Sequence, residues 1–220
     1  MHPHIHFGHC FKGQQGWEQY LSRFVRGEGV LYDLEFLTEA GRRVSAFGYH
    51  AGYAGMAVSL LAWSAQVQNP TALLPPLSTS YNSEESLLED IRAALSAGRL
   101  HNSSNYPRIL IIGALGRCGK GAINACLASG IPESNISEWD MAETDAGGPF
   151  DEILEADIFV NCIYLSAKIP PFVTLESLSK PGRKLRVICD VSCDLSELHR
   201  ELSFNHYLFP FPKPYFGLCH

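Results

Sequence analysis

The feature that most constrains the fold is a short apolar run that leads into a series of glycines, residues 108–121, RILIIGALGRCGKG. Residues 108–112 are rich in β-branched side chains, too short for a helix and bounded by Pro107 and Gly113, so they predict a buried strand. Three glycines follow at three-residue intervals, Gly113, Gly116 and Gly119. Glycines between a strand and a helix allow a tight turn, close approach of the backbone to a pyrophosphate, and close packing of helix on strand. The stretch therefore predicts a dinucleotide-binding turn, with the spacing GxxGxxG rather than GxGxxG.

An acidic residue supports this interpretation. A dinucleotide site requires a carboxylate at the end of the next strand, about 20 residues on, to bind the ribose hydroxyls. Asp140 ends the run 135–140, NISEWD, in that position, with no basic residue beside it. Because a 2′-phosphate would call for a basic neighbour, the sequence favours NAD over NADP.

Strands and helices alternate from residue 106 to residue 194. Further strands are expected at 157–164 and 185–190, with short helices near 150–155 and 174–178. This alternation predicts an α/β fold, a Rossmann-like doubly wound parallel sheet with its ligand crevice at the carboxyl ends of the strands. The segments expected at that edge are 113–119, 140–144, 164–166 and 191–193.

The chain before this domain divides at about residue 47. Residues 1–47 predict a short strand from residue 4, a helix at 13–28, and strands at 29–37 and 42–48 joined by a turn at 38–41. Half an α/β layer rarely buries a complete core, so residues 1–47 are interpreted as the remnant of a larger first domain. Residues 48–105 are interpreted as a connection: a buried helix at 49–68, a loop, and a helix at 84–97 capped by Ser83.

Composition excludes several classes of protein. The formal charge of −6 and the absence of a Lys/Arg cluster in the sequence that could neutralise phosphates argue against a nucleic-acid surface. The longest apolar run is too short to cross a membrane, and the first residues lack the pattern of a signal peptide. The seven cysteines form no CxxC pair, so reduced thiols in a cytoplasmic protein are expected.

Longer motifs are specific to one family. In them the chain closely resembles the NAD-dependent, lysine-forming saccharopine dehydrogenases of fungi over residues 4–194. The motifs are HFGHCFKGQQGW (6–17), LYDLEFL (31–37), GRRVSAFGYHAGYAG (41–55), GALGRCGKGAI (113–123), WDMAET...GGPFDEI (139–153), ADIFVNCIYLS (156–166) and LRVICDVSCD (185–194). The resemblance implies oxidation of saccharopine by NAD to an imine, which water hydrolyses to lysine and 2-oxoglutarate in the aminoadipate pathway of lysine biosynthesis. It also implies a monomer of two Rossmann-like domains, similar to alanine dehydrogenase, with the substrate between them.

The same resemblance implies roles for individual residues. His9, in FGHC, matches the catalytic acid/base histidine of the family. The positions that match substrate-binding residues are Gln14, Arg42, Arg43 and Phe47. The positions that match NAD-binding residues are Gly116 and Arg117 at the pyrophosphate, Asp140 at the adenosine ribose, and Thr144, Tyr164, Val191, Ser192 and Cys193. Cys118 and Cys162 correspond to a cysteine pair near the cofactor, for which a disulfide is not expected in the cytosol.

Departures from the family leave three functions open. Family members carry a further portion ahead of the residue that matches Met1, and the resemblance is expected to stop at Asp194, which makes residues 195–220 a divergent tail. The chain is therefore expected to be either the enzyme or an impaired fragment that only binds NAD(H). A third hypothesis is a metal site at the alternating histidines His2, His4, His6 and His9, although no metal ligand is assigned. Some relatives end in a peroxisomal tripeptide, but this chain ends in Leu-Cys-His, so a cytoplasmic protein is expected.

Overall fold

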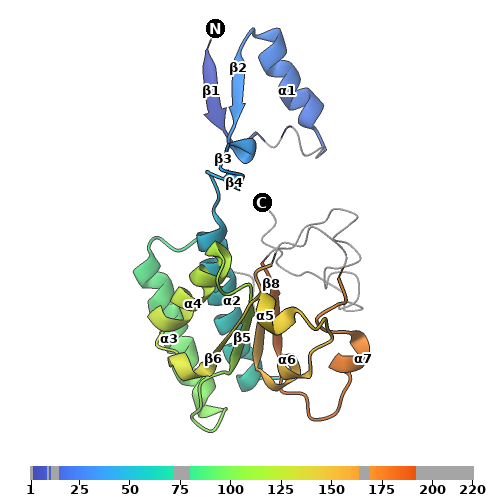
Figure 1. Ribbon diagram of the computed structural model, residues 1–220. Helices are drawn as coiled ribbons and strands as arrows, with labels where there is room; N and C mark the ends of the chain where they lie inside the picture. The colour runs from blue at the N-terminus through green and yellow to red at the C-terminus, as the bar shows by residue number, and fades with distance from the viewer. Residues whose placement is uncertain (1, 9, 11–14, 72–79, 164–168, 192–220) are drawn as a thin grey trace. The chain divides into compact units, whose positions relative to one another are not determined.

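A computed structural model describes residues 2–8, 10, 15–71, 80–163 and 169–191. The chain forms two compact units, Met1–Phe47 and Gly48–His220, and each is described by itself (Figure 1).

The first unit is a small parallel strand pair with one helix. Strand β1 (Pro3–His6) pairs with β2 (Val30–Asp33), and α1 (Trp17–Arg26) connects them as in a βαβ unit. The helix has no buried residue, and Cys10 and Glu35 are the buried residues among the described part of this unit. The interpretation of residues 1–47 as the remnant of a larger substrate domain stays a prediction.

The end of this unit differs from the expected pair of long strands. Strand β2 stops at Asp33, whose side chain accepts a hydrogen bond from the backbone N–H of Glu35 and caps the 3₁₀ helix Leu34–Phe36. A short hairpin follows, β3 (Thr38–Glu39) and β4 (Arg42–Arg43). Its two turn residues, Ala40 and Gly41, have φ of +48° and +74°, which is the backbone of a tight hairpin turn. The predicted strands at 29–37 and 42–48 were therefore too long.

The second unit is built on a four-stranded parallel sheet in the order β6-β5-β7-β8. Its strands are β5 (Ile109–Ile112), β6 (Ile136–Trp139), β7 (Ile158–Asn161) and β8 (Val187–Asp190). The chain moves from β5 to β6 on one side and then crosses to β7 on the other, so the strand order reverses at β5/β7. This arrangement is consistent with a Rossmann-like domain and confirms the predicted parallel sheet.

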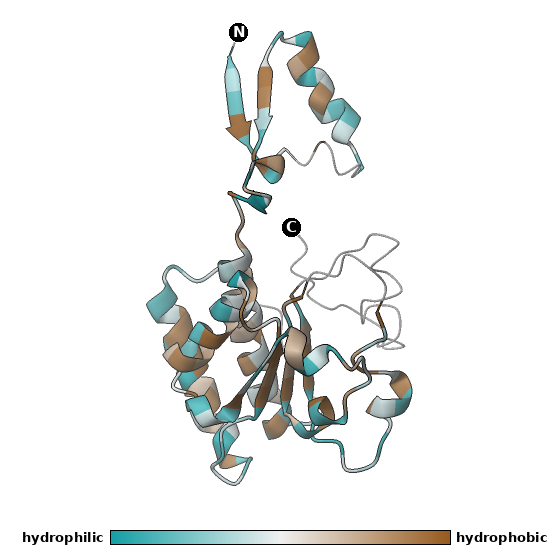
Figure 2. Cartoon of the chain, viewed as in Figure 1, coloured by the Kyte–Doolittle hydropathy of each residue, from teal (hydrophilic) through white to brown (hydrophobic). Residues whose placement is uncertain are grey.

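Helices cover both faces of the sheet (Figure 1). One face packs against α2 (Gly48–Gln68), α3 (Glu84–Leu100) and α4 (Arg117–Ala128), through Ile109 and Ile111 of β5. The other face packs against the region of α6 (Asp151–Glu155) and α7 (Leu175–Leu178), through Leu110 and Ile112. The central strand β5 is accordingly apolar along its whole length (Figure 2), as a strand buried on both faces requires.

Helix α2 packs on the sheet, α3 packs on α2, and both lie in the second unit; their expected role as a connection between domains stays a prediction. The capping of α3 is as predicted, because the Ser83 side chain accepts a hydrogen bond from the backbone N–H of Ser86. One helix was missed: α5 (Met141–Thr144), a single turn that Asp140 caps. No helix in the described part of the chain is long and apolar enough to span a membrane.

Candidate functional site

The glycine turn lies at the carboxyl end of β5, and the space around each glycine differs. Gly113 has φ of +83°, and its backbone N–H donates to the carbonyl of Trp139 at 2.8 Å. A Cβ on Gly119 would lie 2.3 Å from the carbonyl oxygen of Gly113, so any side chain there would push α4 off the turn. A Cβ on Gly116 would lie 3.3 Å from the same oxygen. The turn therefore requires glycine at Gly113 and Gly119, whereas a Cβ at Gly116 would make only a tight contact.

Helix α4 begins at the end of this turn. Gly116 is its N-cap residue, and Arg117 is its first helical residue; both are exposed. The first turn carries no acidic side chain, so the positive end of the helix dipole is not neutralised locally. An anionic pyrophosphate fits such a helix N-terminus, because the first amides of a helix have no partner inside the helix.

Asp140 lies at the end of β6, beside the glycine turn. Its Oδ2 accepts a hydrogen bond from the backbone N–H of Leu115 at 3.1 Å, and its Oδ1 accepts one from the N–H of Met141 at 2.9 Å. Each carboxylate oxygen can accept a second hydrogen bond, so ribose hydroxyls can still bind here. Thr144 belongs to the same structure, since its hydroxyl donates to the carbonyl of Asp140 at 2.8 Å. The predicted residues Gly116, Arg117, Asp140 and Thr144 are thus brought together, and they fit a dinucleotide.

Val191 follows β8 at the same edge of the sheet. Its backbone N–H donates to the carbonyl of Asn161 at 3.0 Å, and its side chain packs against Gly55 of α2. The Asn161 side chain in turn donates to Asp190 Oδ1 at 3.0 Å. The side chain of Val191 therefore contributes to the core, and its role in binding NAD stays a prediction.

Cysteines gather next to the glycine turn. Cys118, in the first turn of α4, is hydrogen-bonded to Cys162, which follows β7, and both are free thiols. The hydrogen bond from Cys162 lowers the pKa of Cys118, whereas the same bond and burial raise the pKa of Cys162. Burial raises the pKa of the neighbouring Cys189 to about 11. Cys118 is therefore the thiol of this group that ionises first.

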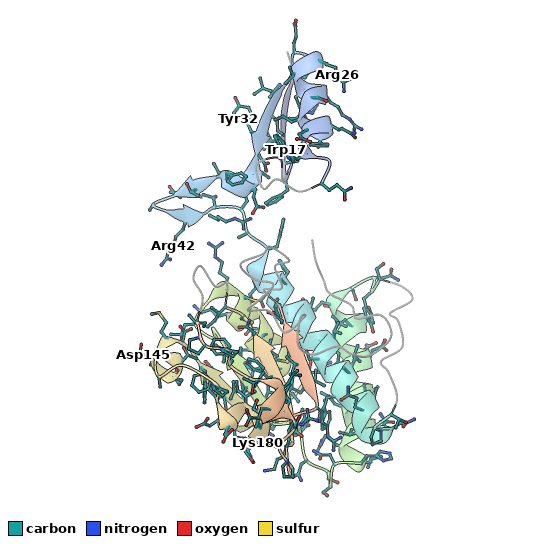
Figure 3. All side chains as sticks on the ribbon, turned by 90° about the vertical axis from the view of Figure 1, so that its right-hand side faces the viewer. Trp17, Arg26, Tyr32, Arg42, Asp145 and Lys180 are labelled. Carbon is teal, nitrogen blue, oxygen red and sulfur yellow. The ribbon has the colours of Figure 1, made fainter. Side chains whose placement is uncertain are left out.

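In the first unit, the predicted substrate-binding residues have different surroundings. Arg43 forms a salt bridge with Glu35, Nη2 to Oε1 at 3.0 Å, and the Glu35 side chain is only 5% exposed. Arg42 is exposed on the β3–β4 hairpin (Figure 3). Phe47 is exposed as well, and its ring centroid lies 5.1 Å from that of Phe7. Glu35 was missed by sequence analysis, and the only signal was an acid within the apolar run LYDLEFL.

A second acid of this unit, Asp33, was also missed. Its Oδ1 accepts a hydrogen bond from the backbone N–H of Gly8 at 3.1 Å, and its Oδ2 accepts one from the N–H of Cys10 at 3.2 Å. Gly8 and Cys10 flank His9 in the sequence. Asp33 therefore fixes the backbone on both sides of the position predicted to be catalytic.

Five predicted site residues lie outside the described residues, and their predicted roles are not tested: His9, Gln14, Tyr164, Ser192 and Cys193. Of the N-terminal histidines, His4 packs its ring against Phe24, and His6 is hydrogen-bonded to the hydroxyl of Tyr20. Within the described ranges, no group of three or more His, Cys, Asp or Glu side chains could hold a metal ion.

Comparison with known proteins gives a consistent set of relatives. No family model matches the sequence. The chain is 51% identical over 214 residues to saccharopine dehydrogenase (NAD+, L-lysine-forming) of Schizosaccharomyces pombe. It is 53% identical over 215 residues to the protein of the same name from Emericella nidulans, and 50% identical over 214 residues to that of Neurospora crassa. The chain is thus homologous to these fungal dehydrogenases.

These alignments cover nearly all of this chain but only part of each relative. They include 97% of this chain, but the chain spans only 58, 57 and 57% of the length of the three relatives. An alignment over 97% of the chain extends beyond Asp194, so the expected end of the resemblance at that residue is not supported.

Proposed function

We propose that the chain acts as an NAD-dependent, lysine-forming saccharopine dehydrogenase, which oxidises saccharopine to lysine and 2-oxoglutarate. The observation that carries this proposal is identity at about half of the positions, 51% and 53%, to two relatives that bear this name. The geometry at the carboxyl edge of the sheet agrees with it. Because lysine would be the product of this reaction, the chain would act in lysine biosynthesis by the aminoadipate pathway.

The glycine turn and its neighbours would hold NAD. The pyrophosphate would bind at the N-terminus of α4, next to Gly116 and Arg117, where amides and a guanidinium are exposed. Asp140 would accept hydrogen bonds from the adenosine ribose hydroxyls while it keeps its bond to Leu115. When bound, NAD supplies a hydride acceptor for the carbon next to the secondary amine of saccharopine.

The first unit would bind the substrate and carry protons. His9 would exchange protons with the amine and with water during hydrolysis of the imine, since imidazole titrates near neutral pH. Gln14, Arg42, Arg43 and Phe47 would hold the substrate, whose three carboxylates suit guanidinium groups. Glu35 would orient Arg43 through their salt bridge, in which Nη2 of Arg43 lies 3.0 Å from Oε1 of Glu35.

The experiment measures oxidation of NADH by the purified chain as a loss of absorbance. The assay contains lysine and 2-oxoglutarate, and each substrate is also omitted in turn. A rate that requires both substrates and is lost in His9→Ala would support the proposal. A rate that persists without either substrate would contradict it.

A second candidate is a chain that binds NAD(H) without turnover. The observation that favours it is the length, because the chain spans only 58% of the Schizosaccharomyces pombe relative. Titration of NADH fluorescence separates the two candidates: saturable binding that weakens in Asp140→Ala, without coupled chemistry, would support the second. Absence of NADH binding would contradict both.

A further inference from the structure

A pocket of about 480 Å³ lies at the amino-terminal edge of the sheet in the second unit. It is lined by Asn102, Asn105, Tyr106, Arg108, Asn135, Asp157, Arg183, Lys184 and Arg186. Each lining segment directly precedes a strand: 102–108 before β5, 135 before β6, 157 before β7 and 183–186 before β8. The glycine turn follows β5, so the pocket and the proposed cofactor site lie at opposite ends of the same strands.

The lining concentrates positive charge on a chain whose formal charge is −6. Arg108, Arg183, Lys184 and Arg186 are all exposed. Only Lys184 is paired, with Glu155 at 2.7 Å; the three guanidiniums form no ion pair with any described residue. The one acid of the lining, Asp157, accepts a hydrogen bond from the backbone N–H of Arg108 at 2.8 Å. Total charge concealed this cluster, because Arg108 lies about 75 residues before the other three cations in the sequence.

The positive field acts on a neighbouring carboxylate. The hydrogen bond from Lys184 and its charge, followed by the charge of Arg108, lower the pKa of Glu155. Glu155 lies on α6, outside the pocket lining, and is the ion-pair partner of Lys184.

Hydrogen bonds tie the lining segments to one another. The Asn135 side chain donates to the carbonyls of Tyr106 and Pro107 at 3.3 and 3.2 Å. The backbone N–H of Arg186 donates to the carbonyl of Asp157 at 3.0 Å. Arg99 lies over the Tyr106 ring, 3.9 Å from its centroid. These contacts fix the segments that carry the cations. A ligand would therefore cause a smaller loss of conformational entropy in the protein when it binds.

We propose that this pocket binds a small multivalent oxyanion, a polyphosphate or a polycarboxylate. Guanidinium groups match both anions because their planar N–H groups bind oxygen pairs bidentately. Three unpaired guanidiniums can share one ligand that carries several charges, and the exposed amide of Asn105 adds a donor beside them. The volume lies in the range of small-molecule sites, about 300–1,000 Å³.

The test uses the whole chain and two probes, tripolyphosphate and citrate, titrated by calorimetry at constant ionic strength. The variant Arg183→Gln/Arg186→Gln removes two of the guanidiniums. The control Arg26→Gln/Arg92→Gln removes the same charge from exposed positions outside the pocket. Titrations are repeated with saturating NADH, because a phosphate probe can also occupy the glycine turn.

The expected result is saturable binding of at least one probe, unaffected by NADH. Binding should weaken at least ~10-fold in the pocket variant and less than ~2-fold in the control, as charge-assisted hydrogen bonds predict. The stronger of the two probes identifies phosphate or carboxylate as the preferred group. Equal weakening in both variants, displacement by NADH, or absence of saturation by either probe would overturn the proposal. Thermal unfolding of both variants near that of the unsubstituted chain establishes that they fold.

Discussion

The backbone N–H of Leu115 donates a hydrogen bond to Oδ2 of Asp140 at 3.1 Å, which ties the glycine turn after β5 to the end of β6. The residue proposed to bind the ribose therefore also shapes the turn proposed to bind the pyrophosphate. Its other oxygen caps α5 through the N–H of Met141. Substitution of Asp140 should consequently affect binding and local stability together.

Asp140→Ala should weaken NADH binding about 10-fold or more, because hydrogen bonds to a charged group contribute about 1.5–3 kcal/mol. It should also lower the free energy of unfolding by about 1 kcal/mol through loss of the helix cap. Fluorescence titration and urea unfolding measure the two effects. The control is Glu138→Gln, an exposed carboxylate on the same strand. Unchanged NADH affinity in Asp140→Ala would contradict the ribose assignment.

Local patterns predicted the sheet well because its strands carry their own signals. The apolar run 109–112 is buried on both faces, so composition alone identifies it, and the glycines mark its turn. The short elements were less predictable. The side chain of Asp33 ends β2 by capping a turn, and the capping box of Asp140 and Glu143 makes α5 from a stretch without helical periodicity. A few side-chain hydrogen bonds determine where such short elements begin and end, and the hydrophobic periodicity of the sequence does not reveal these bonds.

The candidate site was predictable where its residues share one βαβ unit. Gly116 and Asp140 are placed by the strand–turn–helix pattern and its fixed spacing. Glu35 and Asp33 were not predicted, because their partners Arg43 and Gly8 are set by the tertiary fold of the first unit. The cations of the proposed anion pocket come from segments about 75 residues apart, Arg108 and 183–186, and only the parallel sheet brings them together.

Gly121→Ala should destabilise the second unit, because α2 and α4 touch backbone to backbone there. A Cβ on Gly121 would lie 1.9 Å from the carbonyl oxygen of Tyr49, and a Cβ on Gly52 would lie 1.9 Å from that of Cys118. Overpacking against backbone should lower the free energy of unfolding by about 3 kcal/mol and outweigh the better helix propensity of alanine, about 1 kcal/mol. Denaturant unfolding measures this change. Lys120→Ala, exposed on the same helix, should change stability by less than about 0.5 kcal/mol. If Gly121→Ala were as stable as the unsubstituted chain, α2 and α4 would be able to move apart without a loss of stability, which would contradict this prediction.

Cys118 should react with iodoacetamide at lower pH than Cys162 or Cys189. Its pKa is lowered by the hydrogen bond from Cys162, whereas the pKa values of the other two are raised. Cys162→Ala removes that bond, so the midpoint of the pH–rate profile at Cys118 should move to higher pH. Mass spectrometry of the separated peptides measures each rate. Cys126→Ala, a buried cysteine without this contact, should leave the midpoint where it is. A midpoint unaffected by Cys162→Ala would exclude the hydrogen bond as its cause.

Tyr53→Phe should lower stability by about 1 kcal/mol near pH 7, because the Tyr53 hydroxyl donates to Glu84 Oε1 at 2.7 Å in a partly buried setting. Burial and this hydrogen bond raise the pKa of Tyr53 above its ordinary value of about 10. The folded state therefore keeps a proton that the unfolded state releases, and stability falls as the pH rises above about 10. Urea unfolding at pH 7, 9 and 11 should show a smaller fall in Tyr53→Phe. The double substitution with Glu84→Gln should be less than additive, and strict additivity would rule out the coupling.

Asp33→Ala should loosen the backbone at Gly8 and Cys10 without affecting NADH binding. The Asp33 carboxylate accepts hydrogen bonds from the N–H groups of Gly8, Cys10 and Glu35 at 3.1, 3.2 and 3.1 Å, and none of these contacts involves the second unit. Amide hydrogen exchange at Gly8 and Cys10 should accelerate about 10-fold, as expected for a lost hydrogen bond to a charged acceptor. If His9 carries the protons, the lysine-dependent rate should fall while the affinity for NADH stays the same. Glu39→Gln, an exposed acid of the same unit, should change neither quantity. Unaltered exchange at both amides would show that Asp33 does not hold the backbone at Gly8 and Cys10.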